Sequence, residues 1–197
     1  MAGNSDESSI ETLIASGHHA EAARAASAMG AHARAAEIYE KLWDFRAALG
    51  AAHAGGDLSR VLRYALELGD TAAISEAMTA LTATDEGTRT ALDVLTRLRR
   101  HAEAAPLAER LGDTARAIEL YTRAHKELDA ARLLEAQGHD RDAGRLLERA
   151  LDLAADGERA AIQLALGRIL ARRGAYPEAA RLLQDARKDA GLRREAQ

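Results

Sequence analysis

The stretch GAHARAAEIYEKL, residues 30–42, decides the fold, and GDTARAIELYTRA, residues 112–124, repeats its pattern. Each stretch begins with glycine, has two small or apolar residues at the sixth and seventh positions, and continues with apolar residues at helical spacing. Apolar residues three and four positions apart lie on one face of an α-helix, so each stretch predicts a short amphipathic helix. The glycine ends the preceding helix, because it adopts the left-handed conformation without a steric penalty.

The glycines of this pattern follow a fixed register. Several of them are 13 or 26 residues apart, so one unit is 13 residues long. Arg99 and His125 take the place of glycine ahead of two further copies of the pattern. Two units make about 26 residues, and a period of that length is the signature of a repeat array. Asp57, Asp70 and Asp113 each follow a glycine of the register and are expected to be N-caps. The glycines are Gly17, Gly30, Gly56, Gly69, Gly112, Gly138 and Gly174.

The composition favours helix, because the chain is rich in Ala, Leu, Arg and Glu and only 3% aromatic. Short connections force consecutive helices to pack antiparallel. We therefore expect an all-α, right-handed solenoid of antiparallel helix pairs, with about 12–13 helices. The competing fold is a compact helical bundle, which does not require a repeated turn in register. We expect a disordered N-terminus over residues 1–8, a short-repeat array over 9–123 and two more regular repeats over 124–197, continuous with the first array.

The last unit combines a Leu-Gly pair, a glycine turn and small residues at helical spacing. These residues are Leu166-Gly167, Leu170, Gly174, Tyr176, Ala179, Leu183 and Ala186. In them the unit resembles a tetratricopeptide repeat (TPR). Two positions depart from that family's pattern: Gln163 stands where the family often has Trp, and Gly191 stands where it often has Pro. The earlier units are shorter and resemble looser TPR-like α-solenoids.

The resemblance implies a non-enzymatic protein-interaction scaffold or adaptor that binds a peptide or protein on a concave surface. In the TPR register, Arg132 and Arg168 face that surface at equivalent positions, and Arg172 follows one turn later. Three guanidiniums in one groove suit an acidic partner. The other interpretation of these residues is a solvated, Arg-rich helix face.

Trp43 and Phe45 are the largest aromatic residues, and they interrupt the glycine register. One interpretation is that they fill a local gap where small residues fail. The other is that they form an exposed aromatic anchor at an interface, where tryptophan is enriched.

The charge distribution suggests an alternative function. Residues 1–98 carry 8 Lys and Arg against 14 Asp and Glu, whereas residues 159–197 carry 9 against 4. An acidic N-terminal half and a basic C-terminal segment suit head-to-tail self-assembly, so a structural homo-oligomer is an alternative to the scaffold. A third possibility is the regulatory repeat region of a larger signalling protein.

Other functional classes find little support in the sequence. The net charge of -4 argues against nucleic acid as a partner. No apolar run is long enough to span a membrane, and the N-terminus lacks the features of a secretory signal, so we expect a cytoplasmic protein. The pair His18-His19 with His32 could be imagined as a metal site, but repeat register alone explains their placement. The sequence has no phosphate-binding or nucleophile motif, and we expect no catalysis, cofactor or metal.

Overall fold

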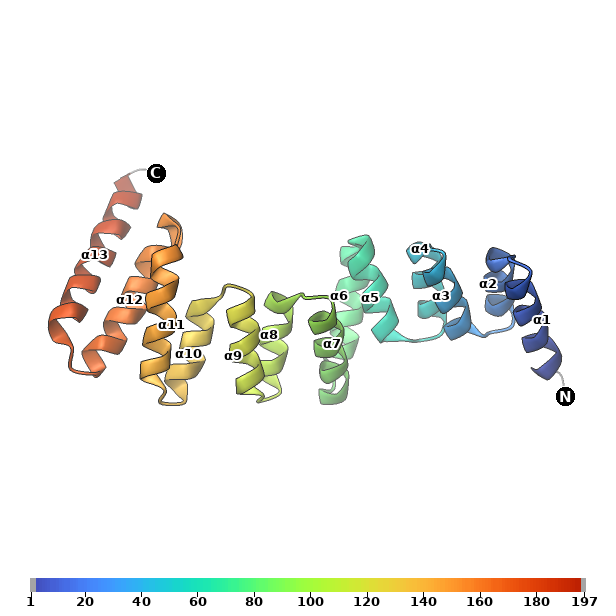
Figure 1. Cartoon of the computed structure of the whole chain (residues 1–197), viewed down its shortest axis with the longest axis horizontal. Helices are drawn as coiled ribbons and strands as arrows, with labels where there is room; N and C mark the ends of the chain where they lie inside the picture. The colour runs from blue at the N-terminus through green and yellow to red at the C-terminus, as the bar shows by residue number, and fades with distance from the viewer. Residues whose placement is uncertain (1–2, 196–197) are drawn as a thin grey trace. The chain divides into compact units, whose positions relative to one another are not determined.

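The computed structural model describes the backbone of residues 3–195 and the side-chain surroundings of residues 8–155 and 157–188. This part of the chain contains thirteen α-helices and no strand, and the chain divides into two compact units, Met1–Leu98 and Arg99–Gln197 (Figure 1). Unit 1 contains α1 (Gly3–Ala15), α2 (His19–Ala28), α3 (His32–Lys41), α4 (Phe45–Ala54), α5 (Leu58–Leu68), α6 (Thr71–Leu81) and α7 (Asp85–Arg97).

Unit 2 begins with short helices and ends with three longer ones. The expected division near residue 124 was based on repeat regularity and remains a prediction, whereas the boundary between the compact units follows Leu98. The helices are α8 (His101–Arg110), α9 (Thr114–Arg123), α10 (Glu127–Ala136), α11 (Asp140–Leu153), α12 (Asp156–Arg172) and α13 (Tyr176–Glu195).

The turns confirm the glycine register. All seven glycines of the register have positive φ, between 66° and 83°. Arg99 and His125 replace glycine and take the same left-handed conformation, with φ of 56° and 54°. Trp43 does so as well, with φ of 59°. The expected N-caps Asp57, Asp70 and Asp113 accept a hydrogen bond from the backbone N–H three residues later, and Asp44 caps α4 in the same way.

The helices pack on one another mainly through alanine. Ala22 and Ala23 of α2 are fully buried, and so are Ala35 and Ala36 of α3. Side chains this small let neighbouring helix backbones approach closely. Within each unit the main contacts join consecutive helices, with additional contacts between α5 and α7 and between α10 and α12. This arrangement confirms the expected TPR-like array of helix pairs, because a compact bundle would bring together helices distant in sequence.

Ion pairs join alternate helices along one row of each unit. Glu11 of α1 pairs with Arg34 of α3 at 2.5 Å, and Glu37 of α3 pairs with Arg60 of α5 at 2.7 Å. The second pair repeats the first after 26 residues, so the charges follow the same period as the turns. The same separation of 23 residues recurs in the pairs Glu40–Arg63 and Glu109–Arg132.

The final helix pair shows how the TPR-like positions pack. A Cβ atom at Gly167 would lie 2.9 Å from Leu183 Cδ2, so glycine there allows α12 and α13 to approach closely. Ala179 is buried in this contact region of α13. Gln163, at the position where the TPR family often has Trp, is buried, and its Oε1 has no hydrogen-bond partner in the described part of the chain.

The N-terminal helix differs from the sequence expectation. We expected the first helix to begin at residue 9, but α1 begins at Gly3. The polar residues before Ile10 are therefore part of α1, and the buried Ile10 lies in the middle of this helix. Met1 and Ala2 of the expected disordered segment lie outside the described residues.

Replacement of Leu147 by alanine tests the helix packing. The Leu147 side chain on α11 is fully buried, so Leu147→Ala is expected to lower the free energy of unfolding by about 2–5 kcal/mol. Leu153→Ala is the matched control, because Leu153 ends the same helix and is 88% exposed. Its effect should stay within about 0.5 kcal/mol. Urea denaturation followed by circular dichroism measures both, and equal effects would contradict the packing.

Candidate functional site

An exposed tryptophan marks the turn between α3 and α4. Helix α3 ends at Lys41, Trp43 takes the left-handed conformation, and Asp44 caps α4 through the Ala47 N–H. The Trp43 side chain is 78% exposed. The left-handed conformation costs an L-residue roughly 1–2 kcal/mol. This turn therefore holds a large apolar ring in water, on a backbone conformation that glycine adopts without strain.

A row of aromatic rings supports Trp43. Its ring meets Phe45 edge to face, with centroids 5.8 Å apart and an interplanar angle of 79°. Phe45 is half-buried and lies 6.1 Å from the ring of Tyr64, which is fully buried in α5. The Arg63 guanidinium lies over the Tyr64 ring at 4.7 Å. The row thus runs from the core of unit 1 to its surface and limits the freedom of the exposed indole.

Tyr64, the inner member of this row, forms a hydrogen-bonded cluster with Glu40 and Arg63. The Tyr64 hydroxyl donates to Glu40 at 2.8 Å, and Arg63 donates to both Glu40 and the Tyr64 oxygen. Burial acts to raise the pKa of Glu40, but the hydrogen bonds from Tyr64 and Arg63 outweigh it, and the pKa lies below its usual value. Burial and the Glu40 hydrogen bond raise the pKa of Tyr64. The cluster is therefore an internal ion pair with its polar groups turned toward one another.

The aromatic row borders an open hollow on unit 1. The hollow has a volume of about 560 Å³, and its walls combine aromatic rings with charged side chains from α3 and α5. A surface hollow beside an exposed aromatic ring suits the side chain of another molecule. It is lined by Glu37, Glu40, Lys41, Trp43, Phe45, Arg63, Tyr64, Glu67 and Leu98.

Trp43 and Phe45, the predicted aromatic residues, differ in their exposure. Gap filling does not describe Trp43, because its ring is mostly exposed. Phe45 does fill space, between Trp43 and Tyr64. The geometry therefore favours the anchor interpretation for Trp43 and gives Phe45 a supporting position. Partner binding by either residue stays a prediction.

The three predicted arginines have different surroundings. Arg132 of α10 pairs with Glu109 of α8 at 2.8 Å. Arg172 of α12 pairs with Glu135 at 2.5 Å and with Asp140 at 3.1 Å. Arg168 is exposed and has no ion pair within the described part of the chain. Two of the three guanidiniums thus link helices of their own chain, and partner binding by the three stays a prediction.

These ion pairs shift the ionisation of their carboxyl groups. The hydrogen bond from Arg132 holds the pKa of Glu109 below its usual value, and the Tyr121 hydroxyl also donates to Glu109 at 3.1 Å. The hydrogen bond from Arg172 likewise lowers the pKa of Asp140. Both Glu109 and Asp140 therefore stay ionised at neutral pH and hold the two arginines in place.

Sequence reasoning missed the Glu40–Arg63–Tyr64 cluster and the partners of Arg132 and Arg172. A signal was present, because glutamate and arginine recur 23 residues apart in several units. That separation places the two residues on alternate helices of the row, where long side chains reach across.

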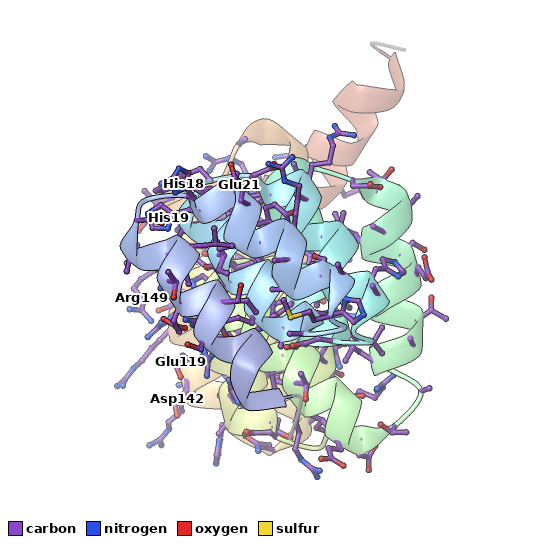
Figure 2. The ribbon with its side chains drawn as sticks, turned by 90° about the vertical axis from the view of Figure 1, so that its right-hand side faces the viewer. His18, His19, Glu21, Glu119, Asp142 and Arg149 are labelled. Atoms are coloured by element: carbon purple, nitrogen blue, oxygen red, sulfur yellow. The ribbon has the colours of Figure 1, made fainter. Side chains whose placement is uncertain are left out.

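The predicted histidine positions do not form a metal site in the described part of the chain. His18 and His19 lie exposed near the turn between α1 and α2, where Figure 2 labels them. Among the described residues, no group of three or more His, Cys, Asp or Glu side chains is arranged so that it could hold a metal ion. None of the described helices is both long and apolar enough to cross a membrane.

Comparison with known proteins gives matches among solved structures. No family model and no curated protein matches the sequence. A putative kinesin light chain with TPR-like repeats from Podosopora anserina is 17% identical, with 96% of this chain and 95% of that chain covered and a TM-score of 0.46. A variant of that protein is 16% identical, covers 98% and 96%, and has a TM-score of 0.47. BtubC (BKLC) from P. vanneervenii is 18% identical, covers 94% and 92%, and has a TM-score of 0.35. The description of this chain as a TPR-like repeat fold rests on its own helix pairs and turns.

Substitution of Trp43 tests the strain at its turn. Trp43→Gly and Trp43→Ala both remove the ring, but only alanine keeps a Cβ atom in the left-handed conformation. The glycine variant is therefore expected to be more stable than the alanine variant by about 1 kcal/mol. Chemical denaturation measures the difference. An alanine variant as stable as the glycine variant would show that the turn carries no strain.

The pH dependence of Glu109→Gln tests the ion pair between α8 and α10. Because the folded-state pKa of Glu109 is lowered, the pair stabilises the fold above the usual pKa, and this stability is lost as the pH falls through the lowered value. The variant is expected to lose up to about 1 kcal/mol at pH 7, and the loss should shrink as the pH falls through the lowered pKa of Glu109. Urea denaturation across this range provides the measurement. A loss that stays constant with pH would contradict the role of the charge.

Proposed function

We propose that this chain is a non-enzymatic protein-interaction scaffold that binds a peptide or protein partner, with Trp43 as its main contact in unit 1. One observation carries the proposal: a tryptophan that is 78% exposed stands at a strained turn where most other units have glycine. Its ring gains little from the folded chain alone. Burial of an aromatic side chain by a partner would supply the missing stabilisation.

The surroundings of Trp43 support this role. Phe45 and Tyr64 restrict the ring, so less side-chain freedom is lost when a partner binds. The adjacent hollow of about 560 Å³ can receive a side chain of the partner. Tryptophan at the edge of such a hollow is the residue type that most often dominates binding energy at protein interfaces.

The shifted ionisable groups favour binding over catalysis. Glu40, Arg63 and Tyr64 are hydrogen-bonded to one another, and Glu109 is held by Arg132 and Tyr121. A general acid or base must face its substrate, whereas these groups face their own ion-pair partners. The altered pKa values of these groups are therefore explained by the packing of helix on helix.

A second surface of the scaffold lies on α8, α10 and α12. It includes the predicted contact residues Arg132, Arg168 and Arg172, and we propose that it binds an acidic partner segment on the concave side of the array. Arg168 is the member of this set that has no ion pair in the described part of the chain, so it is the one most available to a partner carboxylate.

Affinity capture from the native source tests the role of Trp43. The tagged full chain, Trp43→Ala and Tyr176→Ala are compared, and bound proteins are identified by mass spectrometry. Tyr176→Ala is the matched control, because Tyr176 is also an aromatic residue, 69% exposed, and it begins α13 of the other unit. A partner is expected with the unchanged chain and the control, and its recovery should fall about tenfold with Trp43→Ala.

Direct titration then confirms contact. Trp43 is the only tryptophan of the chain, so its fluorescence reports burial of this one ring. The captured protein, added in purified form, is expected to shift the emission to shorter wavelength. The proposal fails if Trp43→Ala captures the same proteins in the same amounts, or if no captured protein changes the emission.

A further inference from the structure

Helix α12 exposes a stripe of residues that ends at the predicted contact residue Arg168. Gly157, Ala161, Leu164 and Arg168 follow one another at spacings of three or four residues, and all four are exposed. Leu164 is 47% exposed, which is unusual for a leucine in a helix whose opposite side is fully packed. The stripe is therefore apolar in its first half and cationic at Arg168.

The apolar half of the stripe opens into a hollow between α12 and α13. The hollow has a volume of about 530 Å³, and its small side chains leave room for a side chain of a bound molecule. Close contact at Gly167 holds the two helices together, with Leu183 against the α12 backbone. The wall on α13 is formed by Leu183, Ala186 and Arg187. The lining residues are Gly157, Ala160, Ala161, Leu164, Leu183, Ala186 and Arg187.

Two exposed arginines belong to the surroundings of this hollow. Arg168 lies one helical turn, about 6 Å along the axis, beyond Leu164. Arg187 lines the hollow from α13. Neither arginine has an ion pair within the described part of the chain, in contrast to Arg172, which is held by Glu135 and Asp140. Residues 159–197 carry 9 Lys and Arg against 4 Asp and Glu, so the surroundings also favour an anion.

We infer that the α12–α13 hollow, with Arg168 and Arg187, binds an acidic amphipathic segment of a protein partner. This inference rests on the proposed scaffold function and assigns a place and a chemistry to its acidic partner. A leucine-sized side chain enters the hollow, and carboxylates one turn away on the segment pair with Arg168 and Arg187. Guanidinium and carboxylate form short, charge-assisted hydrogen bonds, which fix the orientation of the segment.

The mixed character of the surface favours a peptide over nucleic acid. Nucleic-acid binding depends mainly on many cationic contacts to phosphates. Here most residues that line the hollow are Gly, Ala or Leu, Arg187 is the one charged residue among them, and Arg168 follows one turn beyond Leu164. An apolar anchor beside a carboxylate uses both halves of the surface, as a helix docked in a groove does.

Synthetic peptides provide the test. The probe is a capped, fluorescein-labelled peptide of about twelve residues with leucine and glutamate one turn apart. Two matched peptides replace glutamate with glutamine or leucine with alanine. Fluorescence anisotropy at low salt is measured with the full chain. The glutamate–leucine peptide is expected to bind about tenfold more tightly than either matched peptide.

Variants of the full chain locate the binding. Arg168→Glu combined with Arg187→Glu is expected to weaken the peptide about tenfold or more. The control, Arg141→Glu combined with Arg181→Glu, changes the net charge equally at two other exposed arginines and should leave affinity unchanged. Leu164→Gln should weaken binding without a loss of helicity in circular dichroism. Trp43→Ala should bind the peptide normally, so this test is independent of the capture experiment.

Several outcomes would overturn the inference. They are equal binding of the glutamine peptide, equal loss in both arginine double variants, and no change in peptide anisotropy up to about 1 mM of the chain. Light scattering adds another. Self-association of the chain that disappears in Arg168→Glu with Arg187→Glu would assign this surface to a second copy instead of a partner. If the peptide test fails while capture depends on Trp43, the scaffold function stands and this site does not.

Discussion

Close contact between neighbouring helices through alanine is the interaction on which the rest of the structure depends. Ala22, Ala23, Ala35 and Ala36 are fully buried, and Ala104, Ala105 and Ala130 are equally so in unit 2. A helix of ten residues is marginal in water, so each one must be held by the helices before and after it. Alanine offers little apolar area, and it stabilises the array by letting backbones pack closely. Larger side chains such as Tyr64 and Leu147 are also fully buried.

Ion pairs of arginine with glutamate join alternate helices, which the alanine contacts between consecutive helices do not. Short side chains in the contact between consecutive helices leave alternate helices near enough for long side chains to bridge them, as Glu37 and Arg60 do. Each exposed pair contributes little on its own. Because the ion pairs recur with the helical repeat, the same face of each of these helices is charged. In the last helix pair, Arg168 and Arg187 have no such bridge within the described part of the chain.

The sequence predicted the features that depend on local chemistry. The left-handed turns at Arg99 and His125 and the N-cap at Asp113 follow from position in the 13-residue register, and the structure confirms them. The start of α1 at Gly3 was not predicted, because the residues before the buried Ile10 are polar and give no apolar pattern. The pairing of Arg132 with Glu109 could not be derived from either residue alone, since it depends on two side chains meeting across a separation of 23 residues.

The ion pairs between alternate helices have a mechanical consequence. In unit 1 they join α1, α3 and α5, while α4 and α6 of the other row are bridged by His53 and Glu76, a contact that is ionic only when His53 is protonated. Dissolved salt screens exposed charges over about 8–10 Å. Rising ionic strength is therefore expected to weaken the bridges among α1, α3 and α5 more than the contact between α4 and α6 while His53 is neutral, so that the two rows of helices respond differently to salt.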